Sequence, residues 1–156
     1  MFKDFMNDTQ VTLPSNKDAT LRVSTYGIIE QDKELLLVRD GRGENGLEFP
    51  GGGVDIGESP QEALVREVKE ETGYTIDEDM TIFKVSNGNF YHAQKDTYYC
   101  SVNLFFTCSL SSTVRGKQRL ASEDEISEVT FFEKGMLEDK MMAVFHRDIY
   151  REYKTR

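Results

Sequence analysis

Residues 52–74 read GGVDIGESPQEALVREVKEETGY, and this stretch carries the strongest signals in the 156-residue chain. Ser59 and Glu62 have the spacing of a capping box, which marks the start of a helix. A proline follows the cap, at the first helical position, where its missing N–H costs nothing. Gly73 is a natural stop for a helix. The pattern therefore predicts a helix over residues 60–72.

The predicted helix carries three glutamates, Glu67, Glu70 and Glu71, at spacings that place them on one face. Like charges so placed repel one another, and a divalent cation on that face makes the arrangement favourable. Clustered carboxylate oxygens suit Mg²⁺ or Mn²⁺, which take phosphate oxygens as further ligands. A solvated acidic helix is the alternative interpretation. The glycines at 51–53 and 57 favour a ligand site, because glycine lets backbone approach a ligand closely.

Two charged residues of the same stretch are candidates for holding this region in shape. Arg66 lies four residues from both Glu62 and Glu70 on the predicted helix, so it can hold a carboxylate in place and tie the helix to the preceding loop. Glu58, just before the helix cap, can close back onto the glycine loop.

Bulk properties narrow the class of protein. The chain is 38% hydrophobic and 30% charged, with a net charge of −9, which argues against binding to nucleic acid polymers. It does not exclude a polyphosphate substrate, because bound cations invert the local field. The sequence has no run of the roughly 18 apolar residues that a membrane helix needs, and residues 1–18 lack the pattern of a secretory signal. We therefore expect a cytoplasmic protein that makes no membrane contact.

The rest of the chain predicts an α/β fold in a single domain over residues 1–156, with a mixed sheet covered by a few helices. A second helix is expected from Met136 onward, and His92 and His146 are expected to be surface or packing residues. Residues 50–53 are expected to break regular structure, and residues 1–19 to form a loose arm or an edge strand. Residues 109–122 are expected to form a loop. Strands are predicted at residues 21–29, 35–38, 47–49, 81–85, 90–92, 98–108 and 129–132.

Residues 52–74 resemble the Nudix box, G-x5-E-x7-R-E-U-x-E-E-x-G-U, in which U is a bulky apolar residue. Tyr74 is aromatic at the last position, where an aliphatic residue is usual. The resemblance implies an α/β/α sandwich with a mixed sheet. It also implies metal-dependent hydrolysis of a phosphoanhydride bond in a nucleoside diphosphate linked to another group. The residues in register are Gly52, Glu58, Arg66, Glu67, Val68, Glu70, Glu71 and Gly73.

The resemblance also implies roles for individual residues. Arg66 would orient a glutamate, and Gly52 and Glu58 would shape the loop. A carboxylate would take the proton from the attacking water. Its candidates are Glu67 and Glu70 on the helix, then Glu125 and Glu123 in the acidic segment before the last predicted strand. The ligands of Mg²⁺ or Mn²⁺ would be Glu67, Glu70, Glu71 and the carbonyl oxygen of Gly51.

Residues outside the box bear on the substrate. Arg39 ends an apolar strand and is a candidate for contact with phosphate. Three aromatic residues could stack on a base or pack in the core, namely Phe49, Tyr91 and Tyr98.

The short chain favours a nucleoside triphosphate as substrate, including an oxidised one, over a dinucleoside polyphosphate or a nucleotide sugar. In some subfamilies of the family that the box resembles, a proline downstream of the box marks ADP-ribose enzymes, and its absence around residues 88–91 lowers the case for ADP-ribose. A non-catalytic nucleotide-sensing domain is the alternative of another class, and the intact glutamate set disfavours it. A homodimer is compatible with the sequence.

Overall fold

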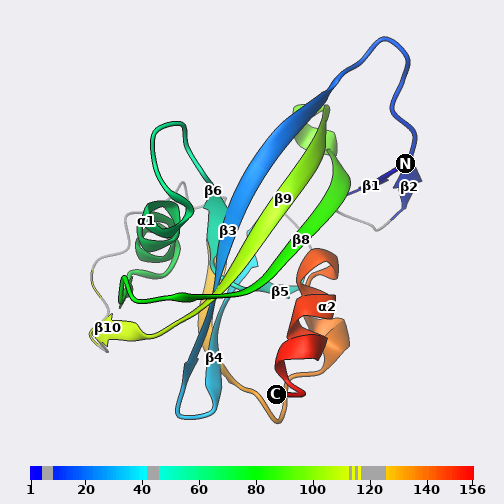
Figure 1. Cartoon of the computed structure of the whole chain (residues 1–156). Coiled ribbons are helices and arrows are strands. Elements are labelled where there is room, and N and C mark those ends of the chain that lie inside the picture. The colour runs from blue at the N-terminus through cyan, green and yellow to red at the C-terminus, as the bar shows by residue number, and fades with distance from the viewer. Residues whose placement is uncertain (5–8, 42–45, 113, 115, 117–125) are drawn as a thin grey trace.

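A curved sheet with one helix on each side forms the frame of the molecule in a computed structural model of the chain (Figure 1). The structure describes residues 1–4, 9–41, 46–112, 114, 116 and 126–156. The helices are α1 (Pro60–Thr72) and α2 (Val144–Tyr153), with single 3-10 turns η1 (Ala93–Lys95) and η2 (Asp139–Met141). The strands are β1 (Phe2–Asp4), β2 (Gln10–Val11), β3 (Ala19–Gln31), β4 (Glu34–Asp40), β5 (Leu47–Glu48), β6 (Gly51–Gly53), β7 (Thr75–Ile76), β8 (Thr81–His92), β9 (Thr97–Cys108), β10 (Leu110–Ser112) and β11 (Ile126–Glu133).

The main sheet has the strand order β11-β4-β3-β9-β8-β1-β2, with β5 paired to β4 and β6 paired to β3. Strand β3 runs parallel to β9, and β1 runs parallel to β8. Strand β4 runs antiparallel to both β3 and β11, and β8 runs antiparallel to β9. The sheet is therefore mixed, and the α/β fold predicted from the sequence is confirmed.

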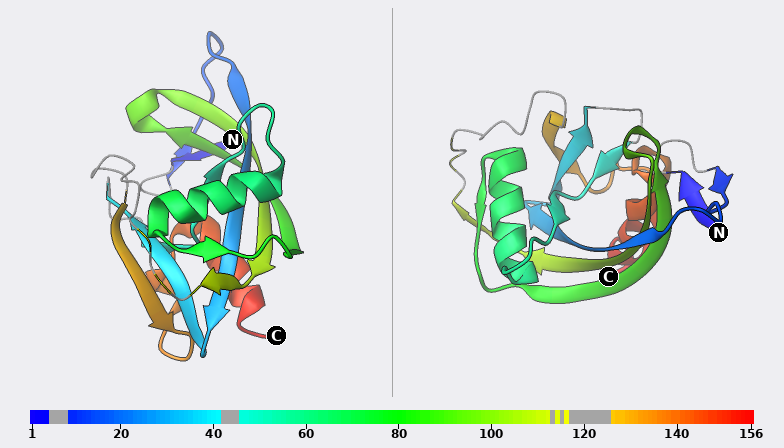
Figure 2. Two further views of the ribbon diagram at one scale, coloured as in Figure 1. Left: turned by 90° about the vertical axis from the view of Figure 1, so that its left-hand side faces the viewer. Right: turned by 90° about the horizontal axis from the view of Figure 1, so that it is seen from above.

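Neighbouring residues along the central strands point to opposite faces of the sheet, because side chains alternate in a strand. Ile28 and Phe105 belong to the core under α2, whereas Ile29 and Phe106 belong to the core under α1. Figure 2 shows the two helices on opposite sides of the curled sheet. This division leaves the edge of α1 that carries the glutamates beside the glycine strand β6, and so positions the site described below.

Helix α1 spans the residues that the sequence predicted. The Ser59 hydroxyl accepts a hydrogen bond from the Glu62 N–H at 3.2 Å, and the Glu62 carboxylate accepts one from the Ser59 N–H at 2.7 Å. Gly73 ends the helix in the left-handed conformation, with φ of 76°, and its N–H donates to the Lys69 carbonyl. All of these contacts are local, which is why the helix could be predicted from the chain alone.

The prediction that residues 50–53 break regular structure is wrong. Residues 51–53 form β6, which pairs in antiparallel fashion with residues 24–26 of β3. Gly51 has φ of +148°, and a Cβ there would lie 2.1 Å from the Thr25 carbonyl oxygen. The strand forms because glycine permits this close approach of two backbones.

Three further elements differ from the sequence predictions. Residues 81–85 and 90–92 are parts of one strand, β8, because β9 pairs along its full length. Residues 110–112, predicted as loop, form β10 against β7. Helix α2 begins only at Val144, since the Ala143 N–H donates to the Leu47 carbonyl at 2.9 Å and holds the preceding chain extended against β5.

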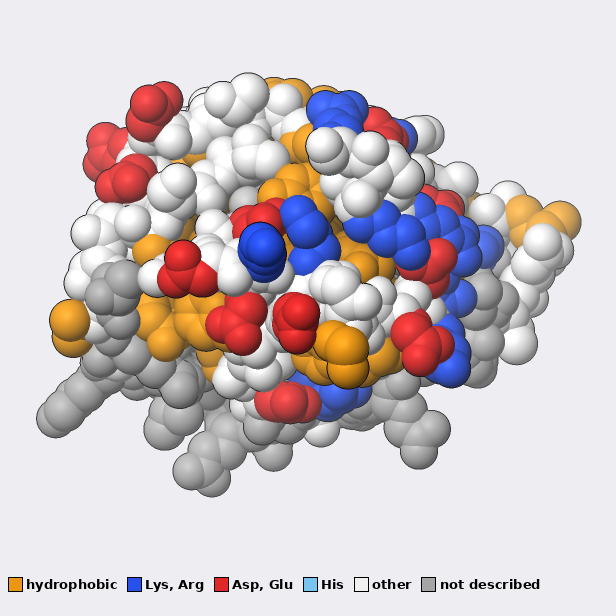
Figure 3. All heavy atoms as spheres, turned by 90° about the horizontal axis from the view of Figure 1, so that it is seen from below, with side chains coloured by type: hydrophobic (Ala, Val, Ile, Leu, Met, Phe, Trp, Pro, Cys, Tyr) orange, Lys and Arg blue, Asp and Glu red, His pale blue; other side chains and the backbone are white. Residues whose placement is uncertain are grey.

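The N-terminal residues lie at the edge of the sheet, where β1 pairs with β8 and β2 pairs with β1. Figure 3 shows acidic and basic side chains interleaved on the face seen from below. That face therefore lacks the single-sign field that attracts a polyelectrolyte. No helix in the described part of the chain is both long enough and apolar enough to cross a membrane.

Candidate active site

The glutamate face of α1 forms one wall of a cavity of about 340 Å³. The strand β6 runs along this wall, and the other residues that line the cavity belong to β3, β4, β5, β8, β9, β11, η1 and α2. All three glutamates predicted as metal ligands line the cavity, together with the three glycines of β6. The structure thus brings the acidic face of the helix to a pocket and not to open solvent.

Glu71 is the most deeply placed of the three glutamates. Its carboxylate accepts a hydrogen bond from the Gly51 N–H at 2.9 Å. Burial raises the pKa of the Glu71 carboxyl well above its ordinary value, and the Gly51 hydrogen bond opposes this only in part. A charge in this position needs a compensating cation, which is what the proposed ligand role would provide.

Glu67 lies directly against the glycine strand. A Cβ on Gly52 would lie 2.6 Å from the Glu67 carboxyl carbon, so a larger residue there would displace this carboxylate. Burial also raises the pKa of Glu67, against the opposing effect of Arg66. The loop glycine and the helix glutamate therefore depend on each other for their positions.

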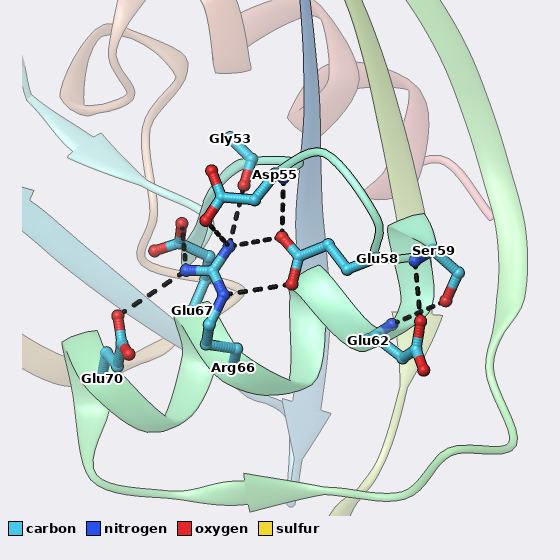
Figure 4. A network of polar contacts seen from close by, with 8 residues as sticks. All are labelled: Gly53, Asp55, Glu58, Ser59, Glu62, Arg66, Glu67 and Glu70. Atoms are coloured by element: carbon cyan, nitrogen blue, oxygen red, sulfur yellow. Dashed lines mark hydrogen bonds and ion pairs between the residues drawn. The ribbon is translucent and has the colours of Figure 1, made fainter.

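Arg66 is the centre of a network that joins α1 to the loop before it (Figure 4). Its guanidinium donates two hydrogen bonds to the Glu58 carboxylate, at 2.7 and 3.2 Å, and one to the Gly53 carbonyl at 3.0 Å. It also donates to Glu67 at 2.9 Å, and its Nη1 lies 3.7 Å from a Glu70 oxygen. The bond to the glutamate that faces the cavity fits the orienting role that the sequence suggested.

The contact of Arg66 with Glu62, which the spacing allowed, is not made. The Glu62 carboxylate points to the Ser59 N–H in the capping box, so it turns away from the arginine (Figure 4). Glu58 replaces it as the partner, and its own carboxylate accepts a further hydrogen bond from the Asp55 N–H at 2.7 Å. Arg66 and Glu58 together hold the loop closed over the start of the helix.

We expect Arg66→Ala to lower both stability and turnover, because it removes charged hydrogen bonds from a side chain that is only 30% exposed. The melting temperature should fall by about 4 °C or more, which corresponds to ~1–2 kcal/mol for a chain of this length. Arg151→Ala is the matched control, since Arg151 also contacts two carboxylates but is 51% exposed. Equal melting temperatures for wild type and Arg66→Ala would exclude the positional role.

A second acidic wall faces α1 and was not found from the sequence. Asp40 ends β4 and Glu48 lies on β5, and both line the cavity. Their charges add to the rise in the pKa of Glu71. The available signal was the polar residue 48 between the apolar residues 47 and 49, because a polar residue inside a short apolar strand often has a specific role.

His146 packs in the interior as the sequence suggested, and it also lines the cavity. Its Nδ1 accepts a hydrogen bond from the Phe49 N–H at 3.2 Å, so in the neutral ring the hydrogen is on Nε2. Burial lowers the pKa of His146 to about 3, which keeps the ring neutral. Nε2 lies 3.9 Å from a Glu48 oxygen, and the histidine thus faces the second acidic wall.

The substrate-binding candidates from the sequence do not line the cavity. Phe49 is 1% exposed and packs against Phe105, so of its two predicted roles, stacking on a base or packing in the core, the structure supports the core. The Tyr91 hydroxyl donates to Asp96, and its ring packs on Tyr98, away from the glutamates.

Arg39 is the remaining candidate of this group, and its Nε donates to Glu128 across the β4–β11 pair at 2.9 Å. The loop candidates for a general base, Glu125 and Glu123, lie outside the described residues.

The donor set of the cavity fits a hard divalent cation. Its carboxylates are oxygen ligands of the kind that Mg²⁺ and Mn²⁺ prefer. Two of them, Glu67 and Glu71 on α1, are buried enough to disfavour their charged forms. Among the residues that the structure describes, no three His, Cys, Asp or Glu side chains already converge as a formed metal site. Part of the reason is that the Glu67 carboxylate, which would have to bind the cation, accepts a hydrogen bond from Arg66.

Comparisons with known proteins identify the family of this chain. Residues 20–153 match the family model of the NUDIX domain. An ADP-ribose pyrophosphatase from Methanocaldococcus jannaschii is 31% identical over 137 residues, which cover 84% of this chain and 72% of that protein. An 8-oxo-dGTP diphosphatase from Escherichia coli (strain K12) is 40% identical over 58 residues, which cover 35% of this chain and only 45% of that protein.

Solved structures show the same fold. A MutT NUDIX hydrolase from Burkholderia pseudomallei matches with a TM-score of 0.64 at 23% identity, over 85% of this chain and 97% of that one. A MutT protein from Bacillus halodurans matches with a TM-score of 0.65 at 20% identity, over 86% and 83% of the two chains. The fold and the acidic cavity define a protein of the Nudix class. With the family match over most of its length, the chain belongs to the Nudix family.

Proposed function

We propose that this protein hydrolyses a phosphoanhydride bond in a nucleoside diphosphate linked to another group, and that it requires Mg²⁺ or Mn²⁺. The observation that carries the proposal is the cavity in which Glu67, Glu70 and Glu71 meet the glycine strand β6. Membership of the Nudix family supports the same reaction class. The cavity also has cations of its own, Arg22 and Lys95, which suit an anionic substrate.

Each part of the wall has a task in this reaction. A bound divalent ion would neutralise phosphate charge and acidify the attacking water. The three glutamates of α1 and the Gly51 carbonyl would hold such ions, and Gly52 leaves room for the Glu67 carboxylate. Glu67 and Glu70 are the helix candidates for accepting the proton from water. Arg66 donates a hydrogen bond to Glu67, and in this proposal it would orient that carboxylate without contacting the reacting atoms.

For the substrate, a nucleoside triphosphate or an oxidised nucleotide stays our first choice, and a relative named as an 8-oxo-dGTP diphosphatase supports it. ADP-ribose is the second candidate, since the relative that matches 84% of this chain is named an ADP-ribose pyrophosphatase. Dinucleoside polyphosphates and nucleotide sugars are further alternatives. All of these candidates share a nucleoside with a diphosphate, and we propose that this part binds in the cavity.

A substrate panel tests the proposal. We expect ATP, GTP, 8-oxo-dGTP, ADP-ribose, a dinucleoside polyphosphate and a nucleotide sugar to differ widely in rate with Mg²⁺, with at least one turned over well. The products should carry a phosphate or a diphosphate, which chromatography would identify. Binding of nucleotides without turnover of any panel member would favour the non-catalytic sensing domain instead.

A further inference from the structure

The end of the cavity away from α1 is formed by the concave face of the sheet. Across β3 and β9 the register places Arg22 opposite Ser101 and Ser24 opposite Asn103. Across β9 and β8 it places Ser101 opposite Gly88. These residues lie on one face, because directly paired residues and every second residue of a strand point the same way. This surface could not be found from the sequence, since its strands are far apart along the chain.

A hydrogen-bond relay fixes the side chain of Asn103. The Ser101 hydroxyl donates to the Gly88 carbonyl at 3.0 Å, and Asn103 Nδ2 donates to Ser101 Oγ at 3.2 Å. The only hydrogen of the Ser101 hydroxyl is committed, so its oxygen must accept, and this sets which end of the Asn103 amide faces it. Asn103 thereby keeps an oxygen acceptor and a second N–H to offer to a ligand in the cavity.

Aromatic side chains share the cavity with this amide. Phe90 and Phe145 line the same cavity, with ring centroids 5.7 Å apart. Phe90 also stacks on Tyr99 at 5.0 Å, and the Arg22 guanidinium lies over the Tyr99 ring at 5.7 Å. Flat apolar walls beside one oriented amide are the surroundings that a nucleobase needs, because a base has two apolar faces and a hydrogen-bonding edge.

The spacing between this end and the acidic wall matches a nucleotide. Ser24 pairs with Gly53 on one side and with Asn103 on the other, so Asn103 lies two strand spacings, about 10 Å, from β6. Arg22 lies between, and a Cβ on Gly53 would be 3.3 Å from its Nη2. A phosphate held between β6 and Arg22 would therefore place an attached nucleoside with its base towards Asn103.

We propose that Asn103 is the specificity residue of a nucleobase subsite and that the base it reads is adenine. This inference rests on the proposed function and names the nucleoside of the substrate. An amide binds best to an edge that presents a donor beside an acceptor. Adenine presents such a pair on both of its edges, N6–H with N1 and N6–H with N7. Guanine presents such a pair on one edge only, O6 with N1–H, because its other edge carries two acceptors, O6 and N7.

The test compares ATP with purine riboside 5′-triphosphate, which lacks only the N6 amino group. Wild type should show a kcat/KM about tenfold to a hundredfold lower for the purine riboside compound, mainly through KM. Asn103→Ala should lower kcat/KM for ATP and abolish the difference between the two. Asn89→Ala is the matched control, because Asn89 is exposed and lies on the opposite face of β8.

Ser101→Ala is a second variant that changes the cavity less. It removes the acceptor that orients the Asn103 amide, so it should weaken the discrimination without abolishing it. Equal kcat/KM values for the two triphosphates in wild type would overturn the proposal. So would a discrimination that persists unchanged in Asn103→Ala.

A binding measurement separates failure of this inference from failure of the proposed function. Calorimetric titration of the same two triphosphates into a Glu71→Gln variant, with Mg²⁺, measures their binding affinities and so tests base recognition without turnover. Tighter binding of ATP there supports the adenine subsite even if no nucleotide is hydrolysed by wild type. Equal binding contradicts the subsite even if hydrolysis is fast.

Discussion

Glu71→Gln is expected to lower turnover by about 10²-fold or more while the melting temperature stays the same or rises. The glutamine carbonyl can still accept the hydrogen bond from the Gly51 N–H, so the local structure is kept. The substitution also removes a buried charge that folding must otherwise tolerate. A site that gains stability when its acid is removed is one whose acid was retained for chemistry.

The control for this variant is Glu62→Gln on the same helix. Glutamine serves equally well at the third position of a capping box, and Glu62 does not line the cavity. Its rate and melting temperature should both stay near those of wild type. Steady-state kinetics and thermal unfolding followed by circular dichroism measure the two quantities. A Glu71→Gln enzyme with a normal rate would remove the central residue from the proposed site.

Removal of divalent ions should abolish hydrolysis, and Mg²⁺ or Mn²⁺ should restore it. The reason is that the cavity contains several glutamates, which repel a diphosphate, and too few cationic side chains to offset this repulsion. Arg66, the nearest arginine to these acids, is already bonded to Glu58, Glu67 and Gly53. Hydrolysis of ATP or ADP-ribose before and after treatment with excess chelator is the measurement.

Direct binding of Mn²⁺, followed by electron paramagnetic resonance, gives a readout that does not depend on activity. Wild type should bind Mn²⁺ more tightly than Glu70→Gln, because Glu70 lines the cavity and its side chain is 34% exposed. Unchanged rates in excess chelator would contradict metal-assisted hydrolysis. Identical Mn²⁺ affinities would leave Glu70 outside the ligand set.

The acidic wall of the cavity could be predicted from the sequence because its determinants are local. The cap of α1, its glycine stop and the spacing of its glutamates all lie within 23 residues, and helical geometry alone places the three acids together. The same reasoning could not find β6, because a run of glycines carries no strand propensity. That strand forms through backbone contact with β3, about 27 residues earlier.

The end of the cavity away from α1 could not be predicted, because it depends on pairing between strands that are far apart in the sequence. Arg22 and Ser101 become neighbours only when β3 and β9 align in parallel, and no local pattern sets that register. Aromatic residues pose the same difficulty. Phe49 and Phe90 look alike in the chain, yet one is in the core and the other lines the cavity, because burial is decided by what packs on each strand.

The last helix reaches back to the strand that leads into the glycine segment. Ala143 bonds the Leu47 carbonyl, and His146 receives the Phe49 N–H, so this end of α2 holds both sides of Glu48. A random mutational screen that selects for lost hydrolysis should therefore recover substitutions near residues 143–146 as well as in the acidic helix. Such hits would be easy to dismiss as folding defects, although their effect reaches the cavity through one backbone hydrogen bond and one bond to the His146 side chain.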